Sequence, residues 1–274
     1  MVHKGDFSLI VFQGRTADRN ARGMAGAAMM GEALGQRLGM RADIIGQSQA
    51  PQRGNWRPEL NAALPDLRVL AQACEQVHAA HRKPLIAMGR CASALATLPV
   101  LARHRPDALL VWFDAHGDAN TPATSATGYL GGMVLTAAAG LWDSGLGDGL
   151  PLANVVLAGV RDLDPAEREL IDRGLLRSVP PGITMPSELA AAIGNRPVYV
   201  HIDCDVLEPG IVPTEYRVSG GLTLDDLNAC CKVLAQNEIV GIEIAEFEAV
   251  WPETGEAAVP EGLIAALAPL LDAR

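Results

Sequence analysis

An apolar run at residues 108–113, with the sequence ALLVWF, ends directly in Asp114, His116 and Asp118. A short apolar run without alternation predicts a strand that is buried on both faces, as in parallel sheets covered by helices on each side. Side chains alternate along an extended backbone, so the two-residue spacing points the three polar side chains in the same direction. The stretch therefore predicts a polar site at the end of an interior strand.

A second stretch repeats this arrangement, because residues 197–202 (PVYVHI) lead into Asp203 and Asp205. Carboxylates that converge at the ends of buried strands repel one another and resist desolvation. Bound cations are the simplest means of holding such carboxylates together. The two stretches together predict a metal site with two ions.

Apolar strand-like runs alternate with helical patterns along the chain. The expected strands are residues 7–12, 41–45, 83–87, 108–113, 153–159, 197–203 and 240–246. The expected helices are residues 24–38, 60–80, 94–103, 129–141, 187–193, 223–236 and 257–272, with another from residue 165. This alternation predicts an α/β fold with a parallel sheet between helices. Without a recognisable linker or repeat, a single domain over residues 1–274 is expected, and its ligands should bind beyond the carboxyl ends of the strands.

Composition excludes several classes of partner. The net charge of −10 argues against nucleic acid, whose phosphates attract a basic surface. The N-terminus lacks a signal segment, and no apolar run approaches the about 20 residues that span a bilayer. The five cysteines show no C-x-x-C pair, so a disulfide framework is not expected. We therefore expect a cytoplasmic protein that binds neither membrane nor nucleic acid.

The two polar stretches also support a family assignment. Asp114-Ala-His116-Gly-Asp118, together with Asp203-Cys-Asp205, resembles the two metal signatures of the ureohydrolase family of arginases, agmatinases and formimidoylglutamases. The resemblance extends along most of the chain and is weakest before residue 80. It implies a three-layer α/β/α fold with a mostly parallel sheet, a di-manganese centre, and hydrolysis of a guanidino or related carbon–nitrogen bond. Family members are often oligomeric, which leaves a homo-oligomer open here.

The resemblance implies a set of metal ligands, namely Asp114, His116, Asp118, Asp203 and Asp205. The remaining family ligand is a His in an early loop, and Cys91 stands at that position in Met88-Gly-Arg-Cys91. A thiolate is softer than the oxygen and imidazole ligands that manganese prefers, so altered occupancy is expected at its site. The alternative is that Cys91 is a packed thiol. Glu208 replaces the third acid of the second signature, and a supporting role is expected for it.

Substrate residues also follow from the resemblance. Asn120 and Thr127 resemble the arginase loop that holds an α-carboxylate, while Asp164, in the stretch that ends at Glu167, matches the acid that recognises the α-ammonium. Glu246 matches the acid that faces the guanidinium. Asp164 could instead cap the following helix, and Glu246 could pair with an arginine. Taken together, these residues imply a small amino-acid substrate.

One departure from arginases concerns a proton-shuttling His, which is replaced by Gly131. No nearby His compensates, since His201 is expected to be a buried, hydrogen-bonded residue of its strand. Loss of the shuttle should favour a guanidine that is less basic than that of arginine. Cys91, Gly131 and the run Gly128-Tyr-Leu-Gly-Gly resemble the family branch that hydrolyses Nω-hydroxy-L-arginine in D-cycloserine biosynthesis.

The expected reaction converts Nω-hydroxy-L-arginine and water into L-ornithine and hydroxyurea. Asp118 is expected to accept the proton of a water shared by two divalent ions, and Glu246 to stabilise the tetrahedral intermediate. Two alternatives remain open at this point. One is ordinary arginase, agmatinase or formimidoylglutamase activity, and the other is a non-catalytic metal-binding relative.

Overall fold

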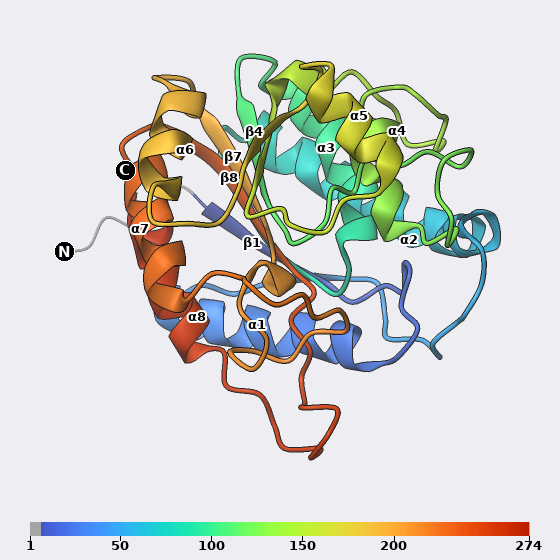
Figure 1. The fold of residues 1–274 in the computed structure, drawn as a ribbon. Helices are drawn as coiled ribbons and strands as arrows, with labels where there is room; N and C mark the ends of the chain where they lie inside the picture. Colours follow the sequence, from blue (N-terminus) through green and yellow to red (C-terminus); the bar gives the residue numbers. More distant parts are fainter. Residues whose placement is uncertain (1–6, 274) are drawn as a thin grey trace.

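A computed structural model describes residues 7–273 of the chain, and its centre is one sheet of parallel strands (Figure 1). The strands lie in the order β2-β1-β3-β8-β7-β4-β5-β6, and each neighbouring pair is parallel. Their bounds are β1 (Phe7–Phe12), β2 (Asp43–Ile45), β3 (Lys83–Met88), β4 (Leu109–Phe113), β5 (Val155–Ala158), β6 (Arg177–Val179), β7 (Val198–Asp203) and β8 (Ile239–Ala245). The predicted α/β fold is confirmed.

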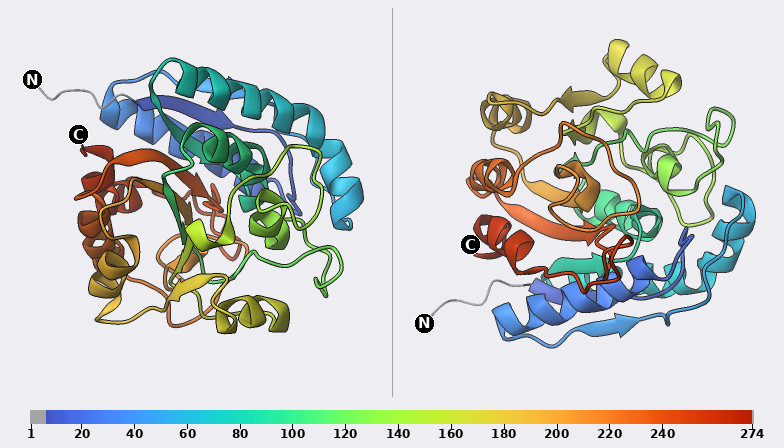
Figure 2. Two further views of the ribbon diagram at one scale, coloured as in Figure 1. Left: turned by 90° about the horizontal axis from the view of Figure 1, so that it is seen from above. Right: turned by 60° about the horizontal axis from the view of Figure 1, so that its bottom comes forward.

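Helices cover both faces of this sheet (Figure 2). One face packs against α1 (Arg22–Leu38), α6 (Met185–Ile193), α7 (Leu224–Leu234), α8 (Glu261–Ala266) and α9 (Ala268–Leu271). The other packs against α2 (Trp56–Ala79), α3 (Ala94–His104), α4 (Val134–Ala138) and α5 (Pro165–Asp172). Short 3₁₀ turns lie at η1 (Cys91–Ser93), η2 (Gly131–Met133), η3 (Leu152–Asn154) and η4 (Cys204–Val206). The molecule therefore has three layers.

Strand β4 shows how the sequence produces this layering. Leu109, Val111 and Phe113 join the core under α1 and α7, whereas Leu110 and Trp112 join the core under α2 and α3. All five side chains are inaccessible to solvent. A strand whose successive side chains enter two different cores must be apolar throughout, which explains the unbroken apolar run.

Three segments differ from the sequence-based expectation. Strand β6 was missed, because its three residues include the polar Arg177 and Ser178 and pair only with β5 at the sheet edge. The helix expected at 129–141 is regular only over α4, and Gly140, with φ at +77°, lies just beyond its end. The expected last helix is divided into α8 and α9 near Pro269, since proline cannot donate a helical hydrogen bond.

Among residues 7–273, no helix is both long enough and apolar enough to cross a membrane.

Candidate metal centre

Four adjacent strands at the middle of the sheet supply the polar residues of the site. In the order β3, β8, β7 and β4, their carboxyl ends lead to Cys91, Glu246, Asp203 and Asp114. Carboxyl ends of parallel strands meet at one edge, so residues from distant parts of the chain converge there. The topology therefore gathers the acids at the edge where the strand-end pattern predicted them.

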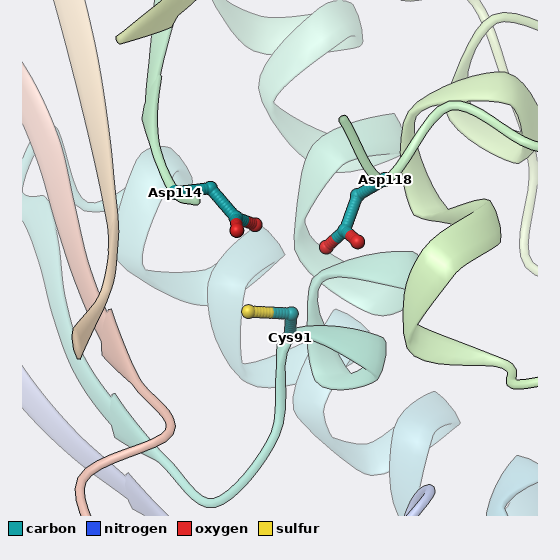
Figure 3. Close-up of side chains that lie close together, drawn as sticks. All are labelled: Cys91, Asp114 and Asp118. Carbon is teal, nitrogen blue, oxygen red and sulfur yellow. The ribbon is translucent and has the colours of Figure 1, made fainter. Parts of the chain in front are cut away.

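The side chains at this edge form three overlapping groups, in each of which one ligand atom per residue lies within 4.8 Å of the others. The groups are Cys91 with Asp114 and Asp118, Cys91 with Asp203 and Glu246, and Asp114 with His116 and Asp205. Figure 3 shows the first group, in which the thiol from the segment after β3 and the two carboxylates from the segment after β4 point toward one another. The structure thus brings together all six residues expected as metal ligands and adds Glu246.

The electrostatics of these groups fit bound cations. Burial and the neighbouring charge of Asp114 raise the pKa of Asp118 well above its ordinary value, and burial with the charge of Asp205 does the same for Asp203. Asp118 is only 7% exposed, and its carboxylate receives no hydrogen bond from the described part of the chain. Buried carboxylates without donors are costly unless they coordinate metal. The donor set, with several carboxylates and one imidazole, suits hard divalent ions.

His116 links two of the acids. Its Nδ1 atom lies 3.2 Å from Oδ1 of Asp114 and 3.1 Å from Oδ2 of Asp205. Although burial favours a neutral imidazole, these two hydrogen bonds raise its pKa. Burial likewise opposes charge on Asp114, but the hydrogen bond and charge of His116 lower the pKa of that carboxyl.

Cys91 is buried between a carboxylate and an imidazole. Its Sγ atom lies 3.0 Å from Oδ2 of Asp203 and 3.2 Å from Nε2 of His201. The other ring nitrogen of His201 lies 2.8 Å from Oε2 of Glu243, and the ring stacks on Trp112 with centroids 3.5 Å apart. The prediction of a buried, hydrogen-bonded His201 is confirmed. Glu243 was missed, although an acid within the apolar strand residues of β8 is a signal for a buried partner.

Glu246 pairs with an arginine, which was the alternative reading of this residue. Nη1 of Arg90 donates to Oε2 of Glu246 at 2.6 Å, and the backbone N–H of Cys91 donates to Oε1 at 3.0 Å. Burial raises the pKa of Glu246 to about 7, although Arg90 opposes this shift. Glu246 and Asp118 both have positive φ, 63° and 46° respectively. Side chains other than glycine rarely adopt such backbone, and these conformations are enriched at functional sites.

The expected substrate residues line one cavity of about 250 Å³ beside the ligand groups. Nδ2 of Asn120 donates to Oδ2 of Asp164 at 2.7 Å. Glu167 accepts hydrogen bonds from the backbone N–H groups of Ala119 and Asp164, both at 2.9 Å, and so fixes the start of α5 relative to the metal-binding loop. Thr127 is exposed at the cavity wall. Asp164 therefore both begins helix α5 and faces the cavity.

Two aromatic residues of the cavity were missed from the sequence. Tyr129 and Tyr216 line it together with Gly131, and His116 is the one histidine among its lining residues. Tyr129 falls in the helix expected at residues 129–141, and Tyr216 falls in none of the expected strands or helices. Neither segment carries a local signal for a binding residue. Glu208 lies outside the cavity and accepts hydrogen bonds at 2.7 Å from the N–H groups of Gly220 and Gly221, which matches the supporting role expected for it.

Comparisons with known proteins agree with this geometry. The model of the arginase family matches residues 10–260. The chain is 41% identical over 241 residues to an N(omega)-hydroxy-L-arginine amidinohydrolase of Streptomyces lavendulae, covering 88% of each chain. It is 35% identical over 199 residues to an arginase of Bacillus caldovelox, covering 67% of this chain and 66% of the relative.

Solved structures share the fold. The arginase of Entamoeba histolytica, crystallised with L-ornithine, superposes with a TM-score of 0.84 at 20% identity and 99% coverage of both chains. The strand-end ligand groups, the fold and the match over residues 10–260 lead to one conclusion: the chain belongs to the arginase family and is a metal-dependent ureohydrolase.

Proposed function

We propose that the protein hydrolyses the guanidino carbon–nitrogen bond of Nω-hydroxy-L-arginine, releasing L-ornithine and hydroxyurea. The observation that carries this proposal is the 41% identity, over 88% of both chains, to the amidinohydrolase of Streptomyces lavendulae that is named for this substrate. Two features of the site support it. Cys91 lies among the ligand groups, and glycine occupies position 131 in the cavity wall.

We further propose that the cofactor is a pair of Mn²⁺ ions. Asp114, His116, Asp118, Asp203 and Asp205 would hold the ions, with Cys91 completing the set. When bound, such ions lower the pKa of water towards neutrality and polarise the group under attack.

The residues of the chain then have separate roles in the reaction. Asp118 accepts the proton that the attacking water gives up, since its carboxylate has no other hydrogen-bond donor in the described structure. Glu246 faces the guanidino group and stabilises the tetrahedral intermediate, while Arg90 holds its carboxylate in place. Departure of the amine yields L-ornithine, and the remaining carbon leaves as hydroxyurea.

The other end of the cavity would hold the amino-acid part of the substrate. Asn120 and Thr127 would bind the α-carboxylate, and Asp164 the α-ammonium. Glu167 would position these residues by accepting hydrogen bonds from the backbone N–H groups of Ala119 and Asp164.

We also propose that the enzyme works in the cytoplasm as a single domain. All five cysteines are free and buried, as expected for a reducing compartment. A homo-oligomer is compatible with the family, and sedimentation of the purified protein would establish its assembly state.

The test of this function is the release of hydroxyurea and urea from Nω-hydroxy-L-arginine and L-arginine, measured side by side with Mn²⁺ present. The proposal requires a higher kcat/KM for the hydroxylated substrate. Preference for L-arginine would identify the protein as an ordinary arginase. Absence of turnover on both substrates, with metal shown to be bound, would indicate another guanidino substrate or a non-catalytic relative.

A further inference from the structure

The hydroxyl group of Tyr129 is buried and has no hydrogen-bond partner within residues 7–273. The residue as a whole is partly exposed and lines the cavity, with Gly131 against its ring. In the same part of the chain, the only other buried side-chain atom without a partner is Oε2 of Glu59, whose other oxygen accepts a hydrogen bond. A buried hydroxyl without a hydrogen-bond partner is destabilising, so a bound ligand that forms a hydrogen bond with it would be favoured.

Two neighbours hold the Tyr129 ring in position. The guanidinium carbon of Arg19 lies 4.6 Å from the ring centroid, and the ring of Tyr216 meets it edge-on with centroids 5.6 Å apart. Arg19 also donates a hydrogen bond to the Tyr216 hydroxyl at 3.0 Å, which fixes these neighbours relative to each other. The ring therefore has little freedom to turn its hydroxyl toward another protein group.

Gly131 provides the space that the ring occupies. A Cβ atom at position 131 would lie only 2.5 Å from Cε1 of Tyr129 and 3.2 Å from Cζ. Any larger residue there would displace the ring. The position of the Tyr129 ring in the cavity therefore depends on glycine at position 131.

The surroundings of the hydroxyl keep it protonated. Burial and the nearby charge of Glu246 raise the pKa of Tyr129 well above its ordinary value. The hydroxyl therefore retains a proton to donate at neutral pH, close enough to Glu246 to feel its charge.

We propose that the Tyr129 hydroxyl is a specificity-determining contact that binds the N-hydroxyl oxygen of an N-hydroxylated guanidine. This inference rests on the proposed function and deepens it. An unmodified guanidinium offers hydrogen-bond donors only, so it leaves the O–H proton of Tyr129 unpaired. The N-hydroxyl group supplies the missing acceptor, and a site with a polar group that only one substrate satisfies discriminates against the other.

The test compares Tyr129→Phe with the wild-type enzyme on both Nω-hydroxy-L-arginine and L-arginine. The kcat/KM for Nω-hydroxy-L-arginine divided by that for L-arginine should fall about 10- to 100-fold, because the variant loses one hydrogen bond to the hydroxylated substrate. Ser187→Ala is the control. It removes an exposed hydroxyl that donates to the carbonyl of Thr184 at the start of α6, outside the cavity, so the ratio should stay close to that of the wild type.

Thermal unfolding separates this role from a structural one. The Tyr129→Phe variant keeps the ring and removes a group without a protein partner, so the Tm of the ligand-free enzyme should not fall. A lower Tm with equal losses on both substrates would overturn the assignment, as would a ratio within about twofold of wild type, which is far below the discrimination expected of such a contact. A wild-type preference for L-arginine would overturn the proposed function and this assignment with it.

Discussion

Arg90 donates from Nη1 to Oε2 of Glu246 at 2.6 Å, and both side chains are buried. The same guanidinium forms ion pairs with Asp18 at 3.1 Å, Glu215 at 2.9 Å and Glu248 at 3.3 Å. One buried cation therefore pairs with four carboxylates, of which that of Glu246 also belongs to a ligand group. Because the loop that carries Arg90 also carries Cys91, this network fixes the position of the thiol relative to Glu246.

Replacement of Arg90 by Met should lower the free energy of unfolding by about 3–5 kcal/mol, since it leaves buried carboxylates without their counter-ion. Arg90→Lys should cost less, because an ammonium restores the charge but not the several directed hydrogen bonds. Denaturant unfolding of the metal-loaded protein measures both values. The control is Arg37→Met, which breaks an exposed pair with Asp272 and should cost under about 1 kcal/mol. Equal losses for Arg90→Met and Arg37→Met would contradict this account.

Cys91→Ala should lower the metal content from two ions per chain to about one, because the thiol belongs to two of the three ligand groups. Atomic absorption on the dialysed protein provides the measurement. Cys204→Ala is the matched control, since Cys204 is equally buried beside Asp203 but belongs to no ligand group in the described residues. Retention of two ions in Cys91→Ala would show that Cys91 is a packed thiol.

Asp118→Asn should reduce kcat by about 10²–10⁴-fold, as expected for loss of a group that accepts a proton in the reaction. In chelator-treated protein the same change should raise Tm, because it removes a buried charge that Asp114, Glu167 and Asp205 repel. Asp172→Asn, at the exposed end of α5, serves as the control and should change neither quantity. An unchanged kcat together with an unchanged Tm would exclude both roles.

The strand-end acids could be predicted from the sequence because the carboxyl ends of parallel strands converge, which places Asp114 and Asp203 at one edge without knowledge of the strand order. The alternation expected for the other ligands was wrong, because β4 ends at Phe113, Asp205 lies in η4 and Asp118 has a φ of 46°. The partners of these acids could not be predicted in this way. Strand β8 is last in the sequence but lies between β3 and β7, which pairs His201 with Glu243 in register and brings Glu246 to Arg90. No local pattern carries that order.

The missed Tyr129 illustrates a second limit. A small, apolar sequence after residue 128 favours a helix, but the regular helix begins only at Val134. The preceding residues instead follow the cavity wall, where contacts with Arg19 and Tyr216 from distant loops fix the ring. Tertiary packing here overrides local propensity.

The pH dependence of stability should include a contribution from His78, far from the metal centre. Its ring stacks on His104 at 5.0 Å, and burial together with the charge of His104 lowers its pKa to about 4, although Glu75 opposes this shift. The unfolded chain takes up this proton near pH 6.5, so the stabilising contribution is complete above that pH and is lost as the pH falls towards 4. Between pH 7 and pH 5 the free energy of unfolding, measured with denaturant, should fall by about 1 kcal/mol more in the wild type than in His78→Gln. Identical decreases would show that His78 titrates alike in the folded and unfolded states.

Gly131 and Tyr129 should be energetically coupled even without substrate. Gly131→Ala places a Cβ atom 2.5 Å from Cε1 of Tyr129, so it should lower the free energy of unfolding by about 1–3 kcal/mol through overpacking. Gly132→Ala is the matched control, because a Cβ atom there meets nothing within 4 Å, and it should be close to neutral. In a Tyr129→Ala background the clash disappears, and the added cost of Gly131→Ala should fall below that in the wild type. Full additivity of the two substitutions would mean that the ring does not occupy the space that Gly131 leaves.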